Sequence, residues 1–405
     1  MKKAVFVGLG VWASSLLGVV TESCSELSEP SHIVRCVLQN HNLLEVNKAE
    51  IEQRESAVVE ASQMVNPQLE LDTGLGSNSE LQADLRLTHT FQLGGKVSRR
   101  EDKAQTLKTL SQVALQRNQE ILTVEIYAQL YRLRQIETEL HVIEEIISTF
   151  TDITRRYRQA GKLTPEERMS LSVFSMALEE NRLKQNGLTN ERNDLLASFE
   201  SGLGREMNIP KNALPQLKTE WPALSANSQI KGARLGIAKT ELDVARSEYE
   251  LQKAESWPDL SLGPRLLYQG GAQEYTGVGA ALSLSLPLYQ VNGGGRARAL
   301  SGVKKQKAAL KFTADSMKAK RTYLAGVYNR MAGLIKATLT GTSVEVKHKG
   351  LHSMINRGVV SAPLVIEFHR QVLEYYQTLH RQELDGIRAL WQIRVIDGEA
   401  LKEIL

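Results

Sequence analysis

The hydrophobic and polar positions of this chain follow two different periods, and the same order of periods occurs twice. From Ser31 to about Val65, apolar residues recur every three or four positions, which predicts an amphipathic helix. Pro67 ends that helix. Apolar and polar residues then alternate over 68–91, interrupted by a Gly-Ser-Asn turn at 76–79. This alternation predicts a β-hairpin with one apolar and one polar face.

The next helical pattern is much longer than a helix of an ordinary globular domain. It runs without a break from about Lys96 to Ala160 and would be on the order of 100 Å long. Such a length predicts a coiled coil. A tight turn follows at 161–165, with Thr164 as the N-cap and Pro165 at the first helical position. A helix then returns to about Gly204.

The second half repeats this plan after a proline-containing connector at 205–225. Its expected elements are a helix at 226–255, a β-hairpin at 259–286, a long helix at 296–356, a turn near 358 and a last helix from 362. Residues 31–204 and 226–398 then form two equivalent repeats, and 399–405 form a C-terminal tail. Because each hairpin lies between helices, we expect all four strands at one end of the molecule.

The N-terminal residues predict export. Lys2 and Lys3 precede an almost wholly apolar run from Ala4 to Val20, the pattern of a secretory signal peptide at 1–23. A retained N-terminal anchor is the alternative. No later segment approaches 18 consecutive apolar residues, so we expect no transmembrane helix in the mature chain.

The chain has two cysteines, Cys24 and Cys36. In an exported protein they can form a disulfide. Cys24 is also a candidate lipid acceptor, although Thr-Glu-Ser before it is a poor lipobox. A third alternative is that cleavage removes Cys24, and the sequence leaves these alternatives open.

Composition and motifs exclude several functions. The net charge is +4, and Lys, Arg, Asp and Glu are mixed along the chain without a basic block, so we expect no nucleic-acid partner. The serine-hydrolase elbow, the phosphate-binding glycine loop and the His-Glu-x-x-His motif are all absent from the sequence. We therefore expect no enzyme activity and no cofactor.

The strands have the length and alternation needed to cross a bilayer. Four strands cannot close a barrel, and open strand edges are not tolerated in lipid. The consistent arrangement is a trimeric 12-stranded outer-membrane β-barrel to which each chain contributes four strands. The alternative is a periplasmic coiled-coil protein, structural or adaptor-like, with two soluble hairpins.

Short segments at matching places resemble the TolC-like outer-membrane factors, and most closely the CzcC-like branch of heavy-metal efflux. Residues 91–96 read Phe-Gln-Leu-Gly-Gly-Lys, like the strand-to-helix turn of that branch. Residues 286–289 read Leu-Pro-Leu-Tyr, like the matching segment of the second half. Tyr157-Arg158 with Gly161, and Arg357-Gly358, are similar to the helical-hairpin tips of the family.

The resemblance implies a fold that is mainly α with membrane β, containing a long coiled-coil α-helical barrel and an internal duplication. It implies a homotrimer in the cell outer membrane, with a large periplasmic portion and contact with outer-membrane lipid. The function implied is a passive exit duct that receives substrates, heavy-metal cations in this branch, from a periplasmic adaptor and an inner-membrane pump of the RND type. Ducts for drugs or for type I secretion are the alternatives within the family.

The resemblance also implies roles for particular residues. The adaptor-docking helix tips are Tyr157, Arg158, Gly161, Lys162, Arg357 and Gly358; the aperture carboxylates are Glu167 and Glu367; the strand-to-helix turns contain Gly94, Gly95 and Pro287. In the second half Leu364 occupies a position where the family often has an acid, and Asn356 replaces the usual tip tyrosine.

A metal site has little support. His348 and His352 lie four residues apart near the second tip, a spacing that can bind a transition metal. Gly350 between them weakens a helix, and no third ligand is evident beyond Glu345. We therefore predict surface histidines and no resident metal.

Overall fold

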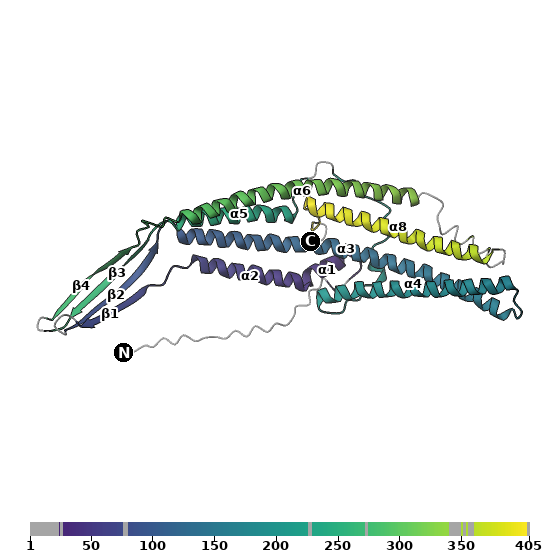
Figure 1. The fold of residues 1–405 in the computed structure, drawn as a ribbon, viewed down its shortest axis with the longest axis horizontal. Helices are drawn as coiled ribbons and strands as arrows, with labels where there is room; N and C mark the ends of the chain where they lie inside the picture. Colours follow the sequence, from purple (N-terminus) through teal and green to yellow (C-terminus); the bar gives the residue numbers. More distant parts are fainter. Residues whose placement is uncertain are drawn as a thin grey trace.

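The computed structural model describes residues 24, 27–75, 80–225, 229–271, 274–339, 350, 354 and 360–402. Its elements are α1 (Pro30–Asn40), α2 (Asn42–Ser62), β1 (Gln68–Leu75), β2 (Leu81–Gln92), α3 (Lys96–Gln159), α4 (Pro165–Leu203), the 3₁₀ turn η2 (Lys211–Ala213), α5 (Ala233–Ala254), β3 (Asp259–Gln269), β4 (Tyr275–Leu284), α6 (Gly293–Leu339) and α8 (Ala362–Asp397). They form an elongated, gently curved body with the sheet at one end and the α3–α4 turn at the other (Figure 1).

The predicted fold class is confirmed. The helices run along the long axis, and the two hairpins join into one antiparallel sheet with the order β1-β2-β3-β4 (Figure 1). Strands β2 and β3 pair across the boundary between the two halves, for example at Arg86 opposite Arg265. No helix of the described part combines the length and apolar character needed to cross a membrane.

The prediction of one helix from Ser31 to Val65 was wrong. The helix is broken at His41, which has extended backbone angles and whose Nδ1 accepts a hydrogen bond from the Leu43 amide at 3.1 Å. This cap lets α1 turn into the core while α2 continues along α3. The second helix ends at Ser62, before Val65, because the chain is already extended ahead of Pro67.

The helix predicted at 226–255 begins later, at Ala233. The amides of Lys231 and Gly232 both donate to the Ile396 carbonyl at 3.0 Å, so this segment is held against the end of α8 rather than coiled. A side chain at Gly232 would overlap the Val395 carbonyl oxygen. The close approach of two backbones therefore sets the start of α5.

The remaining helices and strand β4 lie closer to their predicted bounds. Helix α3 has 64 residues, about 96 Å at 1.5 Å per residue. Strand β4 ends at Leu284 rather than 286, and α6 begins at Gly293 rather than 296. The predicted 296–356 helix is described as far as Leu339. Most of its remainder, and the turn at Gly358, lie outside the described residues. The final helix ends at Asp397, followed by Gly398 at φ 73°.

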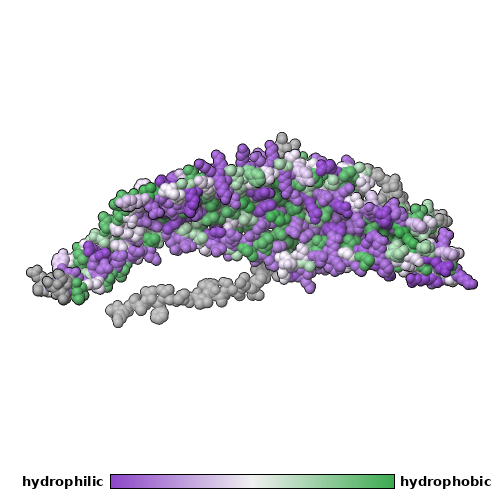
Figure 2. Space-filling model, in the orientation of Figure 1, coloured by the Kyte–Doolittle hydropathy of each residue, from purple (hydrophilic) through white to green (hydrophobic). Residues whose placement is uncertain are grey.

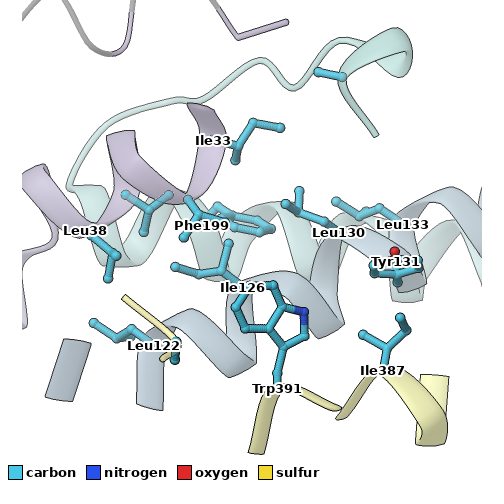
Figure 3. Close-up of a cluster of buried hydrophobic side chains, with 14 of the residues drawn as sticks. Ile33, Leu38, Leu122, Ile126, Leu130, Tyr131, Leu133, Phe199, Ile387 and Trp391 are labelled. Atoms are coloured by element: carbon cyan, nitrogen blue, oxygen red, sulfur yellow. The ribbon is translucent and has the colours of Figure 1, made fainter. Parts of the chain in front are cut away.

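The largest buried cluster lies at mid-length, where the helices meet the connector. Ile126 and Leu130 of α3 pack with Ile33 of α1, Phe199 of α4 and Trp391 of α8 (Figure 3). The connector adds further apolar side chains, including buried Ala213. The cluster thus fixes α1 and the connector to one side of α3.

Cys24 and Cys36 form a disulfide, which resolves one of the alternatives left open by the sequence. The Cys24 sulfur is therefore not available as a lipid acceptor in this structure. The predicted signal peptide at 1–23 lies outside the described residues.

Candidate functional site

The sheet has one mainly apolar and one mainly polar face, with Thr73 and His89 as polar residues on the first and Leu267 as an apolar residue on the second. The strand register places Leu71 beside Leu85, Leu85 beside Leu266 and Leu266 beside Val278. The exposed apolar residues of this face are Leu69, Leu71 and Leu75 of β1, Leu81, Leu85, Leu87 and Phe91 of β2, Leu262 and Leu266 of β3, and Val278, Leu282 and Leu284 of β4. Figure 2 shows green apolar side chains at this end of the molecule, interspersed with purple hydrophilic ones.

The opposite face of the sheet carries a charged cluster. Asp84 accepts two hydrogen bonds from Arg265, Nε to Oδ1 at 2.9 Å and Nη2 to Oδ2 at 2.8 Å. Arg86 also donates to Asp84, and its Nη2 lies 3.1 Å from the Asp72 carboxylate. These contacts link three strands by their side chains on the polar face.

Both outer strands of the sheet have one unpaired edge, since β1 pairs only with β2 and β4 only with β3 in the described part. The helical body also has apolar flanks. Phe312 and Tyr323 of α6 are 71% and 68% exposed, and Leu183 of α4, on the other flank, is 72% exposed. Open edges and exposed apolar flanks are typical of surfaces that a second chain covers.

The strand-to-helix turns are built differently in the two halves. Gly94 and Gly95 adopt φ +71° and +72°, angles that favour glycine, and Gly95 is the N-cap of α3. A Cβ at Gly94 would lie 2.5 Å from the Trp257 side chain, which precedes β3. Pro287 is half-buried and follows β4 at the matching place. The first turn therefore packs tightly against the second half.

The first helix tip is well defined. Gly161 has φ +74°, and Arg158, Gly161 and Lys162 are exposed, whereas Tyr157 is half-buried with its ring 6.4 Å from that of Phe174. Three of the four predicted docking residues of this tip are thus on the surface.

Glu167 has a local role at this tip. Its carboxylate accepts a hydrogen bond from the Thr164 amide at 2.7 Å, and the Thr164 hydroxyl accepts one from the Glu167 amide at 3.2 Å. This reciprocal capping box begins α4, with Pro165 in the first turn.

The second tip is only partly described. Arg357, Gly358, His348 and His352 lie outside the described residues. Glu367, in the first turns of α8, accepts hydrogen bonds from Arg370 at 2.7 and 2.8 Å and from Gln371 at 2.8 Å, and these lower its pKa to about 2. The neighbouring position Leu364 is 56% exposed. Within the described ranges no cluster of His, Cys, Asp or Glu is arranged to hold a metal ion.

The sequence interpretation missed a buried polar network between α3 and α8. Glu139, 1% exposed, accepts hydrogen bonds from His380 at 2.7 Å and Arg132 at 2.9 Å. Burial alone would raise the pKa of Glu139, but these hydrogen bonds outweigh it and lower the pKa. Single polar residues within apolar helical patterns were the only signal of this network in the sequence.

A groove of about 620 Å³ lies on one side of α3. It is lined by α3, α4, α5, α6 and α8. Its basic side chains are Arg117, Arg132, Arg234, Lys320 and Arg388, and its acidic side chains are Glu120, Glu125 and Glu191. Val124, Leu195, Met317 and Leu384 contribute apolar surface. No motif of the sequence pointed to this groove, because its residues come from five separate helices.

Comparison with known proteins places this geometry in context. No protein-family model and no curated protein sequence matches the chain. Solved structures do match. The Campylobacter jejuni CmeC outer membrane channel superposes with a TM-score of 0.73 at 12% identity, over 92% of this chain and 86% of that one. The outer-membrane channel OprN gives 0.70 at 15% identity, over 93% and 95% of the two chains.

CusC, whose structures concern transmembrane channel formation, gives a TM-score of 0.71 at 11% identity, over 91% of this chain and 92% of CusC. This chain has the fold of an outer-membrane channel. The agreement extends along almost the whole length and includes both the sheet and the long helices. The outer-membrane channel fold is thus common to this chain and all three structures, which do not single out the CzcC-like branch.

Proposed function

We propose that this protein is the outer-membrane exit duct of a tripartite efflux system and works as a homotrimer. In this proposal the sheet is the chain's share of a 12-stranded barrel in the outer membrane. The helices continue the duct into the periplasm. The protein conducts passively and performs no chemistry, while an inner-membrane pump, of the RND type by resemblance, supplies the energy.

The observation that carries the proposal is the four-stranded sheet with one mainly apolar face and two open edges. The apolar face is compatible with contact to lipid, but the unpaired strand edges are not. Each backbone group left without a hydrogen bond in lipid costs roughly several kcal/mol. Pairing β1 of one chain with β4 of the next removes both edges at once. The same packing covers Phe312 and Tyr323 of α6 and Leu183 of α4 on the flanks.

Fractionation and conductance test this proposal. We expect the protein in the outer-membrane fraction, a heat-modifiable trimer on gels, and discrete single-channel conductance in planar bilayers. Cysteines placed at Thr73 of β1 and Ala280 of β4, one on each outer strand, should cross-link chains to each other. A soluble periplasmic monomer without conductance would favour the coiled-coil adaptor alternative. No feature of the described structure specifically supports that alternative.

The helix tips are the proposed docking surface for a periplasmic adaptor. Arg158, Gly161 and Lys162 of the first tip are exposed, as docking requires, and the proposal extends to Arg357 and Gly358 by the duplication. Photo-cross-linking from position 158 in cells should capture the adaptor. The same probe at Arg246, an exposed position on α5 near the sheet, serves as the control.

The cargo and the aperture belong to the same proposal. Heavy-metal cations are the cargo implied by the CzcC-like resemblance, and Glu167 and Glu367 are the proposed aperture carboxylates. Deletion of the gene, followed by tests of tolerance to zinc, cobalt, cadmium and copper, examines the cargo. Conductance of the Glu167→Ala/Glu367→Ala variant examines the aperture, since unchanged conductance would exclude these side chains from it.

A further inference from the structure

The groove on α3 holds more positive charge than its acids neutralise. Glu191 is engaged by Arg132, whose Nε and Nη2 donate to its two oxygens at 2.7 Å each. Glu120 is 2% exposed, and its carboxylate accepts hydrogen bonds from the Ala233 amide at 3.0 and 3.1 Å. Of the three acids, only Glu125 stands exposed without such a partner in the described structure.

The remaining cations have no comparable partners. Arg117, Arg234, Lys320 and Arg388 make no hydrogen bond or ion pair within the described ranges of the chain. Burial lowers the pKa of Arg117; nearby Glu120 opposes this, and the charge of Arg234 lowers it further. Like charges held together in a concave, partly apolar surface are relieved by a bound anion.

The side of α3 that carries the groove can be assigned from the sheet. Lys96, at the start of α3, donates to Asp259 on the polar face of the sheet at 2.6 Å. Arg100 donates to Gln92 on the same face at 2.9 Å. Ile121 and Glu125 of the groove lie about seven helical turns beyond Lys96 and Arg100, and therefore on the same side of α3.

The opposite side of α3 is occupied. Leu122, Ile126 and Leu130 face away from the groove and belong to the buried cluster that also contains residues of α1, α4, α8 and the connector. The groove therefore continues the polar face of the sheet, and in the proposed duct that face lines the lumen. Residues of α5, α6 and α8, and Glu191 and Leu195 of α4, complete the lining of the groove.

We propose that this groove binds amphiphilic organic anions, small molecules that join a carboxylate or sulfonate group to an apolar body. Its volume is in the range of small-molecule sites, about 300–1,000 Å³. The guanidinium groups of Arg117 and Arg388 suit an oxyanion. Val124, Leu195, Met317 and Leu384 supply apolar contact. The location in a lumen rests on the proposed function, and the inference adds organic anions to the cargo proposed for that duct.

Calorimetric titration of the purified full-length trimer in a nonionic detergent tests the inference. The probes share one apolar body: naphthalene-2-sulfonate, the neutral naphthalene-2-sulfonamide and the cationic 2-naphthyltrimethylammonium. We expect the sulfonate to bind most tightly and to weaken as salt is raised. Equal binding of the anionic and cationic probes would overturn the inference.

Two exposed groove cations can be removed without disturbing the core. Lys320→Gln/Arg388→Gln should weaken sulfonate binding by about three- to tenfold, as expected for the loss of two partly exposed charge contacts. Binding of the sulfonamide should stay within about twofold. The matched control is Lys318→Gln/Arg330→Gln, which removes the same charge from another surface of α6, where both residues border a separate shallow depression.

The outcomes separate this inference from the proposed function. If the control weakens sulfonate binding as much as the groove variant does, the effect is one of net charge and the inference is wrong. If all variants form conducting trimers and none alters sulfonate binding, the inference alone fails. If the wild-type protein forms no trimer and no conductance, the duct itself fails, while sulfonate binding that depends on Lys320 and Arg388 would still support an anion site.

Discussion

Glu383 offers the sharpest test of what holds the helical body together. It lies on α8, is 0% exposed and accepts hydrogen bonds from three directions. Arg134 and the Gln135 amide of α3 donate to Oε2, the latter at 2.9 Å, and the Lys218 backbone amide of the connector donates to Oε1 at 2.8 Å. One carboxylate thus joins α8, α3 and the connector.

Glu383→Gln keeps the size of the side chain but removes its charge and one acceptor. The new NH₂ group must face a donor, so a buried donor loses its partner, at a cost of about 1–3 kcal/mol. Arg134 also loses its counter-charge in a nearly dry setting. Breaking a buried ion pair on one side costs about 3–5 kcal/mol in total. We therefore expect destabilisation of about 3–5 kcal/mol, with faster tryptic cleavage of the connector.

Urea unfolding followed by far-UV circular dichroism measures this effect in the detergent-solubilised protein. The matched control is Glu374→Gln on the same helix, whose side chain is 64% exposed and pairs with Arg370, and which should cost about 0.5 kcal/mol or less. Adding Arg134→Met to Glu383→Gln should recover part of the loss, because it removes the stranded charge. A difference of less than about 1 kcal/mol between Glu383→Gln and Glu374→Gln would refute the reasoning.

Three further predictions follow from particular positions. Leu71→Arg, on the apolar sheet face, should cost about 2–4 kcal/mol and reduce the heat-modifiable trimer on gels, whereas Gln82→Arg on the polar face should not; equal effects would contradict the face assignment. Gly232→Ala places a methyl group against a carbonyl of α8 and should lower the unfolding midpoint, whereas Gly187→Ala, with open space around it, should raise stability by about 0.5–1 kcal/mol. The pKa of Glu139 is lowered in the fold, so the ionised carboxylate stabilises the folded state. This contribution should be complete above the ordinary pKa of 4.5 and lost as pH falls below it. The unfolding free energies of wild type and Glu139→Gln should therefore converge in urea titrations at acid pH.

The elements were predictable where local pattern and tertiary structure agree. Alternation over 68–91 indicated the first hairpin because one face of those strands is mainly apolar. Thr164-Pro165 indicated the start of α4 because caps are local. The break at His41 and the late start of α5 were not predictable in the same way. The late start of α5 depends on a contact distant in sequence, the backbone of Gly232 against that of Val395. The break at His41 comes with a local cap, in which the Leu43 amide donates to His41 Nδ1.

The candidate groove was beyond sequence reasoning for a related reason. Arg117, Arg234 and Arg388 lie on three helices, and each one read alone is an ordinary solvated cation. Only the packing of α3 against α5 and α8 brings them to one concave surface. The sequence could not decide whether Cys24 forms a disulfide, because the fate of this residue depends on where the chain is processed. Composition does not determine that position.

The two helix tips differ in how their acidic residues are held, so the two halves of the duplication are not equivalent there. In the first half, the proposed aperture carboxylate Glu167 caps its own helix through Thr164. In the second half, Ser361 is the N-cap of α8 without a side-chain cap, and Glu367 is held by Arg370 instead. Replacing Glu167 therefore removes only the reciprocal half of the capping box, the hydrogen bond from the Thr164 amide, while replacing Glu367 frees an exposed arginine. Any change in the opening of the duct must accordingly be measured with each tip substituted separately. The same substitution acts on helix stability at the first tip and on surface charge at the second.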